Sequence, residues 1–413
     1  MGGTLADARG SGSSRYKWHA VAMLWWIALF NYADRQAIFS VFPLLKAQFH
    51  LSPEQLGLLG SSFAWVYGLT APFAGNIVDR IRRKTAILGG LQVWSLICMA
   101  TSLARGFPAL LFFRAAEGLG ETFYFPASMS LLSDYHGPDT RSRALGLHQT
   151  SVYAGTIAGG FFAGLIADNY GWRWSFIVFG GLGILLGFVL SKWLIEPKRT
   201  ASTETRLRLR DFLAEIRHNP AALLILGGFL CANYVALVLL SWMPSFLGER
   251  FHLSLAISGL TATLFVQCAS IAGAPLGGWL ADFWSRRTPA GRTLVQALGL
   301  ALGAPFVALC GQTRSIPVLI LALTCWGLAK GIYDSNIFAA MFDVIRPEAR
   351  GTAAGFLNLV GWMGGGIAPL ATGFLATSFG LGPAISFAAI IYVLGAACLV
   401  AASIRRVQAC DNL

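Results

Sequence analysis

Seven ionisable side chains lie inside long apolar segments of this sequence. A charge at bilayer depth costs about 2.5–3.5 kcal/mol on insertion scales. Such side chains must therefore face an oppositely charged partner or a water-filled cavity, and they indicate a pathway for ions or charged solutes. The set consists of Asp34, Arg35, Arg114, Glu117, Glu121, Lys330 and Asp334.

Helical spacing decides which of these groups can meet. Arg114, Glu117 and Glu121 fall on one stripe of a helix, with about 10 Å along the axis between the first and the last. Asp34 and Arg35 are adjacent and point about 100° apart, so they cannot both face one partner. We expect one of them to line a cavity and the other to reach the helix that carries Arg114.

These residues could bind an anion and carry protons. The planar guanidinium of Arg35 matches a carboxylate, so we expect it to anchor an anionic substrate. Asp34 and Glu121 are expected to carry coupling protons, with Glu117 as a further candidate. Other substrate-binding candidates are Tyr32, Arg114, Gln149, Tyr153, Lys330 and Asn358. Secondary candidates for the same lining are Tyr67, Tyr124, Asn233, Tyr234, Gln267, Asn336 and Trp362.

A structural alternative remains for the charged pairs. Lys330 and Asp334 are spaced i, i+4, and Arg114 and Glu117 are spaced i, i+3, so each pair can neutralise itself on one helix. In that case the pairs only hold helices together.

Long helices are needed to position these groups. The 413 residues are 55% hydrophobic and 12% charged, against about 25% charged in a soluble domain, so we predict an all-α membrane protein. Apolar runs of the length that spans a bilayer core, about 20 residues, recur along the chain. We predict twelve transmembrane helices, at roughly 18–44, 55–78, 85–104, 107–134, 141–168, 173–195, 220–248, 255–281, 291–311, 316–343, 350–378 and 382–404.

The basic residues are distributed unevenly between these spans. Most of the 31 Lys and Arg residues lie in the N-terminal segment, in every second connection and in the C-terminal segment. This bias predicts that both termini are cytoplasmic. Nucleic acid is not an expected partner, because a nucleic-acid-binding protein collects its basic residues on one folded face.

The sequence repeats itself at half its length. His50-Leu51-Ser52 with Gly57 recurs as His252-Leu253-Ser254 with Gly259. Since each half holds six predicted spans, the repeats are parallel, related by an axis along the membrane normal. The predicted parts are a disordered cytoplasmic tail (1–17), an N-terminal six-helix bundle (18–195), a cytoplasmic linker (196–219), a C-terminal six-helix bundle (220–404) and a cytoplasmic tail (405–413).

The stretch from Gly75 to Lys84 resembles the loop between the second and third helices of the major facilitator superfamily. That loop runs Gly-x-x-x-Asp-Arg-x-Gly-Arg/Lys-Arg/Lys, and here Arg82 stands at the usual Gly. A degenerate second copy begins at Gly278. The resemblance implies the fold of this superfamily and an inter-domain latch that stabilises an outward-open state, formed by Gly75, Asp79, Arg80, Arg83 and Asp282.

A finer resemblance lies in the first and fourth spans. Asn31-Tyr32-Ala33-Asp34-Arg35 is similar to the Asn-Tyr-x-Asp-Arg of the anion:cation symporter branch, which includes sialin-like and sugar-acid transporters. The stretch from Arg114 through Glu121 to Pro126 resembles the fourth helix of that branch. The resemblance implies that acids in the first and fourth helices are the proton sites. Spinster-type lipid transporters share much of this pattern.

These observations predict a transporter and no enzyme. The expected function is proton-coupled symport of a small organic anion, a sugar acid or other carboxylate, by alternating access of the two halves. The alternative is a spinster-type lysophospholipid or sphingolipid transporter. We expect a monomer in a bacterial inner membrane, with no cofactor and no metal, since no metal-ligand spacing or nucleotide motif occurs.

Overall fold

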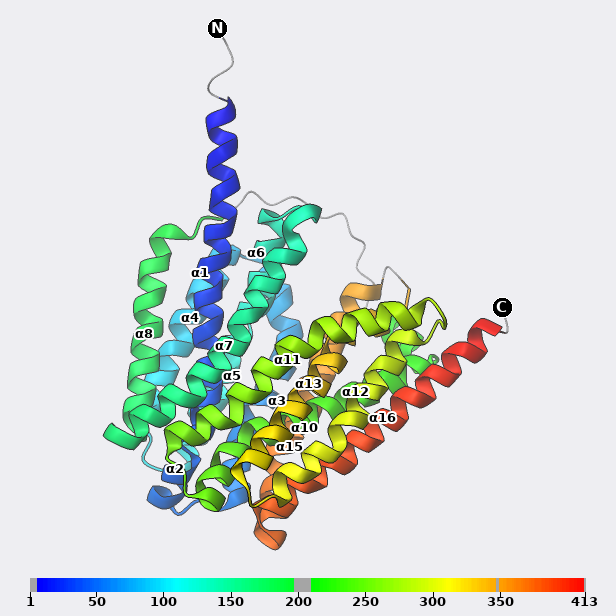
Figure 1. Ribbon diagram of the computed structural model, residues 1–413. Helices are drawn as coiled ribbons and strands as arrows, with labels where there is room; N and C mark the ends of the chain where they lie inside the picture. Colours follow the sequence, from blue (N-terminus) through cyan, green and yellow to red (C-terminus); the bar gives the residue numbers. More distant parts are fainter. Residues whose placement is uncertain (1–5, 197–208, 347–348, 412–413) are drawn as a thin grey trace.

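The computed structural model describes residues 6–196, 209–346 and 349–411, and every regular element in these ranges is a helix. Figure 1 shows two groups of helices side by side, one from each half of the chain. The first group comprises α1 (Ala6–Ser40), α2 (Phe42–Phe49), α3 (Pro53–Arg80), α4 (Arg83–Thr101), α5 (Phe107–Glu121), α6 (Tyr124–Tyr135), α7 (Pro138–Tyr170) and α8 (Trp172–Trp193).

The second group follows the short helix α9 (Leu209–Arg217). It comprises α10 (Pro220–Phe251), α11 (Leu255–Ser285), α12 (Gly291–Gln312), α13 (Ile316–Asp334), α14 (Ile337–Phe342), α15 (Arg350–Phe379) and α16 (Leu381–Asp411). The helix α1 begins, and α16 ends, toward the same end of the molecule (Figure 1). We call this the terminal end and the opposite end the closed end.

The repeated His-Leu-Ser motif forms the same turn in both halves. His50 and His252 adopt left-handed backbone angles, with φ of 52° and 54°, at the ends of α2 and α10. Ser52 then accepts a hydrogen bond from the backbone of Gln55 in α3, and Ser254 caps α11 in the same way. The repeat seen in the sequence is therefore a repeated helix end and helix start.

Two predicted spans are broken by proline. The first span ends at Ser40 and continues as α2 with Pro43 in its first turn, and the fourth divides between Glu121 and Tyr124. Pro126 has no N–H to donate and its ring crowds the carbonyl of Thr122, so the helix cannot continue through this point.

The tenth predicted span is also broken, at Ser335 and Asn336, but without proline. The hydroxyl of Ser335 donates to the carbonyl of Ile332, and the amide of Asn336 donates to the carbonyl of Gly277 on α11. Such side chains compete with the helical hydrogen bonds of the backbone and favour a turn.

The N-terminal segment differs from the expected disordered tail over residues 6–17, which belong to α1. In Figure 1 this helix projects well beyond the others. Extending a formed helix costs little because each added residue gains a hydrogen bond. Residues 1–5 lie outside the described ranges.

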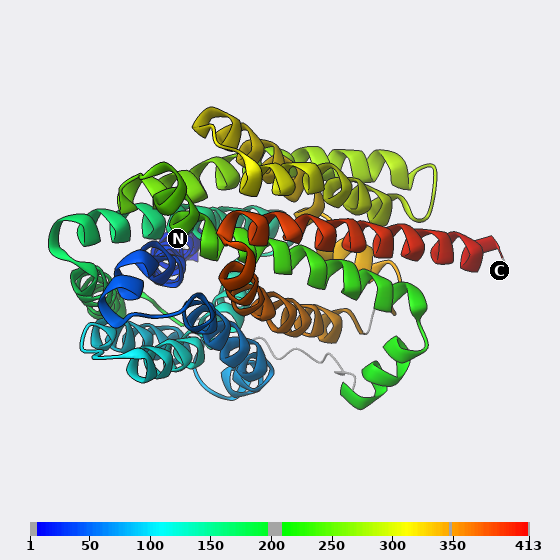
Figure 2. The same ribbon diagram turned by 90° about the horizontal axis from the view of Figure 1, so that it is seen from below.

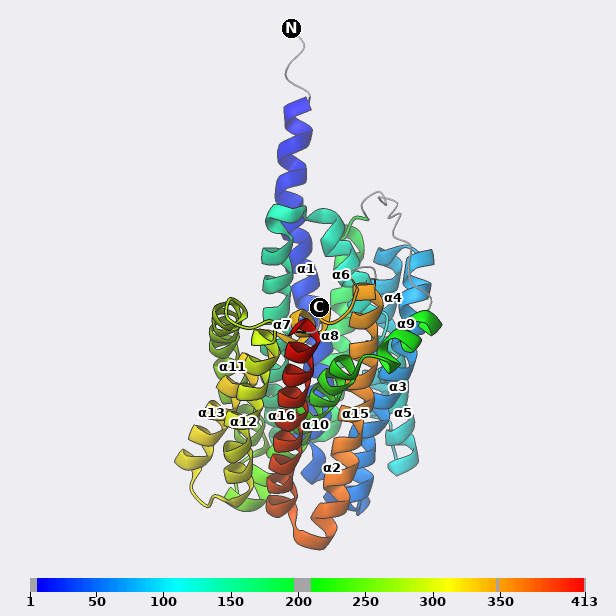
Figure 3. The same ribbon diagram turned by 90° about the vertical axis from the view of Figure 1, so that its right-hand side faces the viewer.

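The predicted linker contains the helix α9, and residues 197–208 of it lie outside the described ranges. Phe212 and Ile216 of α9 are buried, and the ring of Phe212 lies 5.8 Å from that of Phe356 on α15. Arg346 donates to Glu215 at 2.6 Å. These contacts attach α9 to the second group of helices. Figure 3 shows α9 at the side of the molecule.

Glycines bring the two groups into contact at the closed end. Gly57 of α3 lies against the carbonyl of Pro369 on α15, and Gly259 of α11 lies against the carbonyl of Gly160 on α7. A Cβ at Gly57 or Gly259 would overlap these carbonyls. Since Gly57 and Gly259 are equivalent in the repeat, the halves meet through two related contacts, and Figure 2 shows them meeting from this end.

Polar contacts accompany both glycine contacts. Asp168 of α7 accepts from the backbone N–H groups of Leu255 (3.1 Å) and Ala256 (2.9 Å) at the start of α11. A carboxylate at a helix N-terminus is favoured by the unpaired N–H groups and the helix dipole. At the other contact Thr377 of α15 donates to Glu54 of α3, and hydrogen bonds from Ser52 and Thr377 hold the pKa of Glu54 below its usual value.

The groups diverge toward the terminal end (Figure 1), where the predicted latch residues lie. A Cβ at Gly75 or Gly278 would meet nothing within 4 Å, and Arg80 and Asp282 are exposed. Arg83 pairs with Asp134 of its own half. The side chain of Asp79 lies outside what the structure describes. Among the described side chains, Arg80, Arg83 and Asp282 show no contact that joins the halves in this arrangement, so the latch remains a prediction.

Eight described helical segments are long and apolar enough to cross a membrane. Two belong to the first group, Asp139–Tyr170 and Trp172–Trp193, and six to the second. The predicted spans of the first half that carry Asp34, Arg35, Arg114 and Glu117 are not among them. The count of twelve spans therefore remains a prediction.

The glycine contacts generate a prediction about conformation. Gly259→Val should separate the halves at the closed end, because the new side chain overlaps the carbonyl of Gly160. With the accessible native cysteines replaced, spin labels at exposed Arg105 and Arg314 should move apart in a double electron–electron resonance measurement. Gly181→Val is the control, because a Cβ there meets nothing within 4 Å. An unchanged distance in Gly259→Val would contradict the role given to this contact.

Candidate functional site

A cavity of about 540 Å³ lies between the two groups of helices. Its walls come from α1, α3, α5 and α7 on one side and from α10, α11, α13, α14, α15 and α16 on the other. Six of the seven predicted substrate-binding residues line it, namely Tyr32, Arg35, Arg114, Gln149, Tyr153 and Lys330.

Arg35 on α1 is the centre of the charged side of the cavity. Its Nε donates to Glu121 of α5, which is fully buried, while Arg35 itself is 8% exposed. The guanidinium also lies 4.6 Å from the ring centroids of Tyr32 and Tyr67 and 5.2 Å from that of Trp362 on α15. Its Nη1 is buried and has no hydrogen-bond partner. Arg35 is therefore held in place, and the hydrogen-bonding capacity of its buried Nη1 is unused.

Arg114 supports this arrangement from α5. Its Nη1 donates to Glu117 at 2.6 Å, and its Nη2 donates to the backbone carbonyl of Arg35 at 3.0 Å. Its guanidinium lies 4.4 Å from the ring centroid of Phe63. The predicted stripe of Arg114, Glu117 and Glu121 thus faces α1, and Arg114 both lines the cavity and fixes the backbone beside Arg35.

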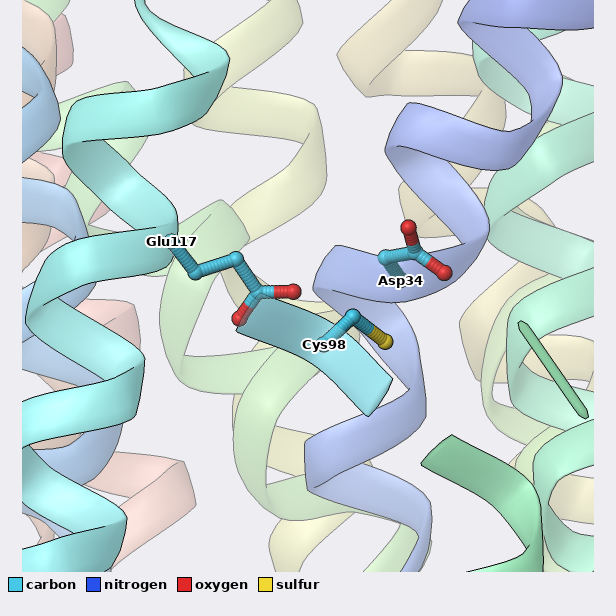
Figure 4. A group of neighbouring side chains, drawn as sticks. All are labelled: Asp34, Cys98 and Glu117. Carbon is cyan, nitrogen blue, oxygen red and sulfur yellow. The ribbon is translucent and has the colours of Figure 1, made fainter. Parts of the chain in front are cut away.

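Asp34 points away from the cavity into the first group of helices. It is fully buried, and neither carboxylate oxygen has a hydrogen-bond partner. Figure 4 shows it with Cys98 of α4 and Glu117 of α5, and the ligand atoms of the three lie within 4.8 Å of one another. No pattern in the sequence pointed to Cys98, because only packing brings α4 beside these acids.

The buried charges of this region do not balance if all are ionised. Three carboxylates, Asp34, Glu117 and Glu121, accompany two guanidinium groups, Arg35 and Arg114. An uncompensated buried charge is costly. We do not assign a metal to Asp34, Cys98 and Glu117. Glu117 already accepts a hydrogen bond from Arg114, and a single proton would balance the buried charge.

Lys330 and Asp334 pair with each other on α13 and both line the cavity. The two side chains therefore form the neutralising pair on one helix that the structural alternative predicts. Its position still leaves the ammonium group beside the cavity, opposite Tyr153 of the first half.

Asn358 is not among the residues that line the cavity. It is partly buried on α15, one turn beyond Trp362 toward the terminal end. The prediction of substrate contact therefore lacks support from the described cavity. Trp362 lines the wall instead, together with Gln267 and Asn233 as predicted, and Tyr67 stacks on Arg35 behind them.

Sequence reasoning missed the apolar part of the wall. Phe39, Phe63, Leu237 and Leu240 line the cavity but look like ordinary apolar residues of a membrane helix. Gln36 was also missed: its amide donates to the carbonyl of Leu240 at 3.0 Å across the two halves. The only sequence signal for Gln36 was its polar side chain inside an apolar run, next to Asp34 and Arg35.

Two helical bundles around a shared cavity with buried charges are the arrangement of secondary transporters. Residues 24–369 and 266–408 match the family description of the Major Facilitator Superfamily, so the chain belongs to this superfamily. It is a multi-pass membrane transporter with the all-helical fold of that superfamily.

Individual relatives agree with this assignment. The probable chloroplastic anion transporter 4 of Oryza sativa subsp. japonica is 28% identical over 403 residues, which cover 92% of this chain and 67% of the relative. The hexuronate transporter of Bacillus subtilis (strain 168) is 25% identical over 381 residues, covering 89% and 90%.

A solved structure has the same fold. It is the crystal structure of a bacterial homologue of the human lysosomal transporter spinster in an inward-facing, unoccupied conformation. The TM-score is 0.86, with 22% sequence identity, over 95% of this chain and 98% of the other.

The ion pair of Arg114 generates a prediction about stability. Glu117→Ala leaves a buried guanidinium without its carboxylate, which should lower the free energy of unfolding by about 3–5 kcal/mol. Unfolding of the purified protein in mixed micelles measures this change. The control is Glu249→Ala, which removes the exposed pair with Lys46 and should cost at most about 1 kcal/mol. Equal losses in both variants would contradict the assignment.

Proposed function

We propose that this protein is a secondary active transporter that moves a small organic anion together with protons by alternating access. The observation that carries the proposal is the position of Arg35, which lines the cavity with a buried Nη1 that lacks a hydrogen-bond partner while its Nε donates to buried Glu121. A planar guanidinium with an available edge suits a carboxylate.

Competition for Arg35 supplies the coupling. The carboxylate of Glu121 and the carboxylate of a substrate both require the same guanidinium. A proton on Glu121 weakens its hold on Arg35 and leaves the guanidinium positively charged for the substrate. Substrate and proton therefore favour each other's binding, which is the requirement for symport.

Asp34 and Glu117 complete the proton pathway in this proposal. Around Asp34 lie Glu117 and Arg114 of α5 and Cys98 of α4, and its two oxygens lack donors. A buried carboxylate without hydrogen bonds is costly as an anion. Asp34 therefore takes the one proton that balances the cluster, and Glu117 remains the partner of Arg114.

The two glycine contacts define one state of the transport cycle. The halves meet at the closed end and diverge at the terminal end, which the positive-inside bias places in the cytoplasm. This corresponds to a state open to the cytoplasm, in a bacterial inner membrane, for a chain that works as a monomer. In the opposite state the latch residues, from Gly75 to Arg83 and Asp282, would join the halves.

The substrate class follows from the charged wall and from the relatives. The guanidinium of Arg35 suits an anion, and the relatives include a probable anion transporter and a hexuronate transporter, of which the second is named for a sugar carboxylate. A spinster-type lysolipid is the second candidate, favoured by the apolar face of α10 in the cavity wall. Competition of a lysophospholipid against a small carboxylate for uptake separates the two.

Glu121→Gln should uncouple transport from protons, because a neutral amide cannot release Arg35 in response to pH. In proteoliposomes with an inwardly directed proton gradient, we expect the variant to lose concentrative uptake while it retains exchange of substrate across the membrane. Asp139→Asn, at an exposed acid at the start of α7 and outside the cavity, is the matched control and should behave as the unchanged protein.

Concentrative uptake by Glu121→Gln would refute the proton role. Arg35→Lys tests the anchor in the same assay, and both uptake and exchange should fall at least tenfold because an ammonium cannot bind a carboxylate bidentately. Retention of both activities would refute the anchor.

A further inference from the structure

The cavity is divided into a charged zone and an apolar floor. The position of a residue along its helix gives its distance from the closed end, since an α-helix rises 1.5 Å per residue. Gln149 and Tyr153 on α7 and Lys330 and Asp334 on α13 lie toward the terminal end of the cavity, whereas Arg35 lies five residues before the closed-end terminus of α1. The part of the cavity that lies level with Arg35 or nearer the closed end, which we call the floor, is lined by Phe39, Gly60, Ala64, Ala236, Leu237 and Leu240, and Leu237 is the repeat equivalent of Arg35.

Helix packing keeps this floor apolar. Gly60 of α3 lies against the ring of Phe39 and the side chain of Pro369. Opposite them, α10 presents Ala236, Leu237 and Leu240 on one face, at i, i+1 and i+4. Both halves therefore contribute hydrocarbon to the floor.

The polar groups beside the floor already have partners. The amide of Gln36 donates to the carbonyl of Leu240 at 3.0 Å, and the amide of Asn233, one turn before Leu237 on α10, donates to the carbonyl of Phe229 at 2.9 Å. A ligand hydroxyl that enters the floor would lose its water without gaining a donor from these groups, which is unfavourable.

Arg35 lies at the boundary between the two zones. Its free Nη1 and its position above Phe39, about one helical turn or 6 Å away, fix where an acid group and its neighbouring atoms must lie. The height of one turn is about that of a six-membered ring. The atoms next to the bound carboxylate therefore contact hydrocarbon.

We propose that the substrate is a carboxylate attached directly to an apolar six-membered ring or a group of similar size, with its acid on Arg35 and its ring on the floor. This inference rests on the proposed anion transport and narrows its substrate class. Polyhydroxylated sugar acids fit the charge of the site but not its floor, because every ring hydroxyl would require a partner there.

A matched pair of ligands tests the proposal. Cyclohexanecarboxylate and D-glucuronate both carry one carboxylate on a six-membered ring, and they differ in the polarity of the ring. Isothermal titration calorimetry of the purified full-length protein should show at least tenfold tighter binding of cyclohexanecarboxylate. Cyclohexanol, which lacks the acid, should bind at least tenfold more weakly than cyclohexanecarboxylate.

A floor variant adds a second measurement. Leu237→Asn places an amide in the floor and should reduce the preference for cyclohexanecarboxylate at least threefold. Leu213→Asn, at an exposed position of α9, is the control and should leave the preference unchanged. The comparison in the unchanged protein remains decisive if Leu237→Asn fails to fold.

The outcomes separate the two proposals. If D-glucuronate binds as tightly as cyclohexanecarboxylate or tighter, and Arg35→Gln removes its binding, the apolar substrate class is wrong while the anion transporter proposal stands. If Arg35→Gln leaves the binding of both acids unchanged, or neither acid binds, both proposals are wrong.

Discussion

The buried ion pair between Arg35 and Glu121 is the constraint on which the rest of the site depends. A guanidinium in this position is tolerable only because Glu121 neutralises it and four aromatic rings surround it. One of those rings, Trp362, belongs to the other half of the molecule. The pair therefore connects α1, α5 and α15, and a substrate that competes for Arg35 changes contacts in both halves.

The closed end shows how two halves with one repeat can form a reversible contact. Gly57 and Gly259 allow backbones to touch without side chains that would interlock, and small residues serve this purpose in membrane helices generally. The accompanying polar contacts are few, with Asp168 on the start of α11 and Thr377 on Glu54. Apolar side chains also pack across the halves there, since Phe42 lies 5.7 Å from Trp242 in a buried cluster that both halves share. Opening of this end must therefore part these contacts as well.

The cavity combines features that suit both kinds of transporter that the sequence resembles, the anion symporters and the spinster-type lipid transporters. Its charged zone, with Arg35 and Lys330, fits anion carriers, and its floor, with Phe39 and Leu237, offers the hydrocarbon that an amphiphile needs. An apolar carboxylate uses both zones. Division into zones arises because α10 turns a hydrocarbon face toward charged residues on α1 and α13, so that neither helix alone defines the ligand.

The sequence by itself determined the helical membrane class, the superfamily and most of the charged wall, because a charge such as Arg35 inside an apolar run has few tolerable positions. It also predicted the repeat that forms equivalent turns at His50 and His252. Only the tertiary structure decided that Asp34 points to Cys98, that Asn358 lies off the cavity and that Leu237 forms its floor. These three outcomes depend on which helix faces pack together. The identity of an apolar residue does not reveal whether its side chain faces lipid, the protein core or a substrate.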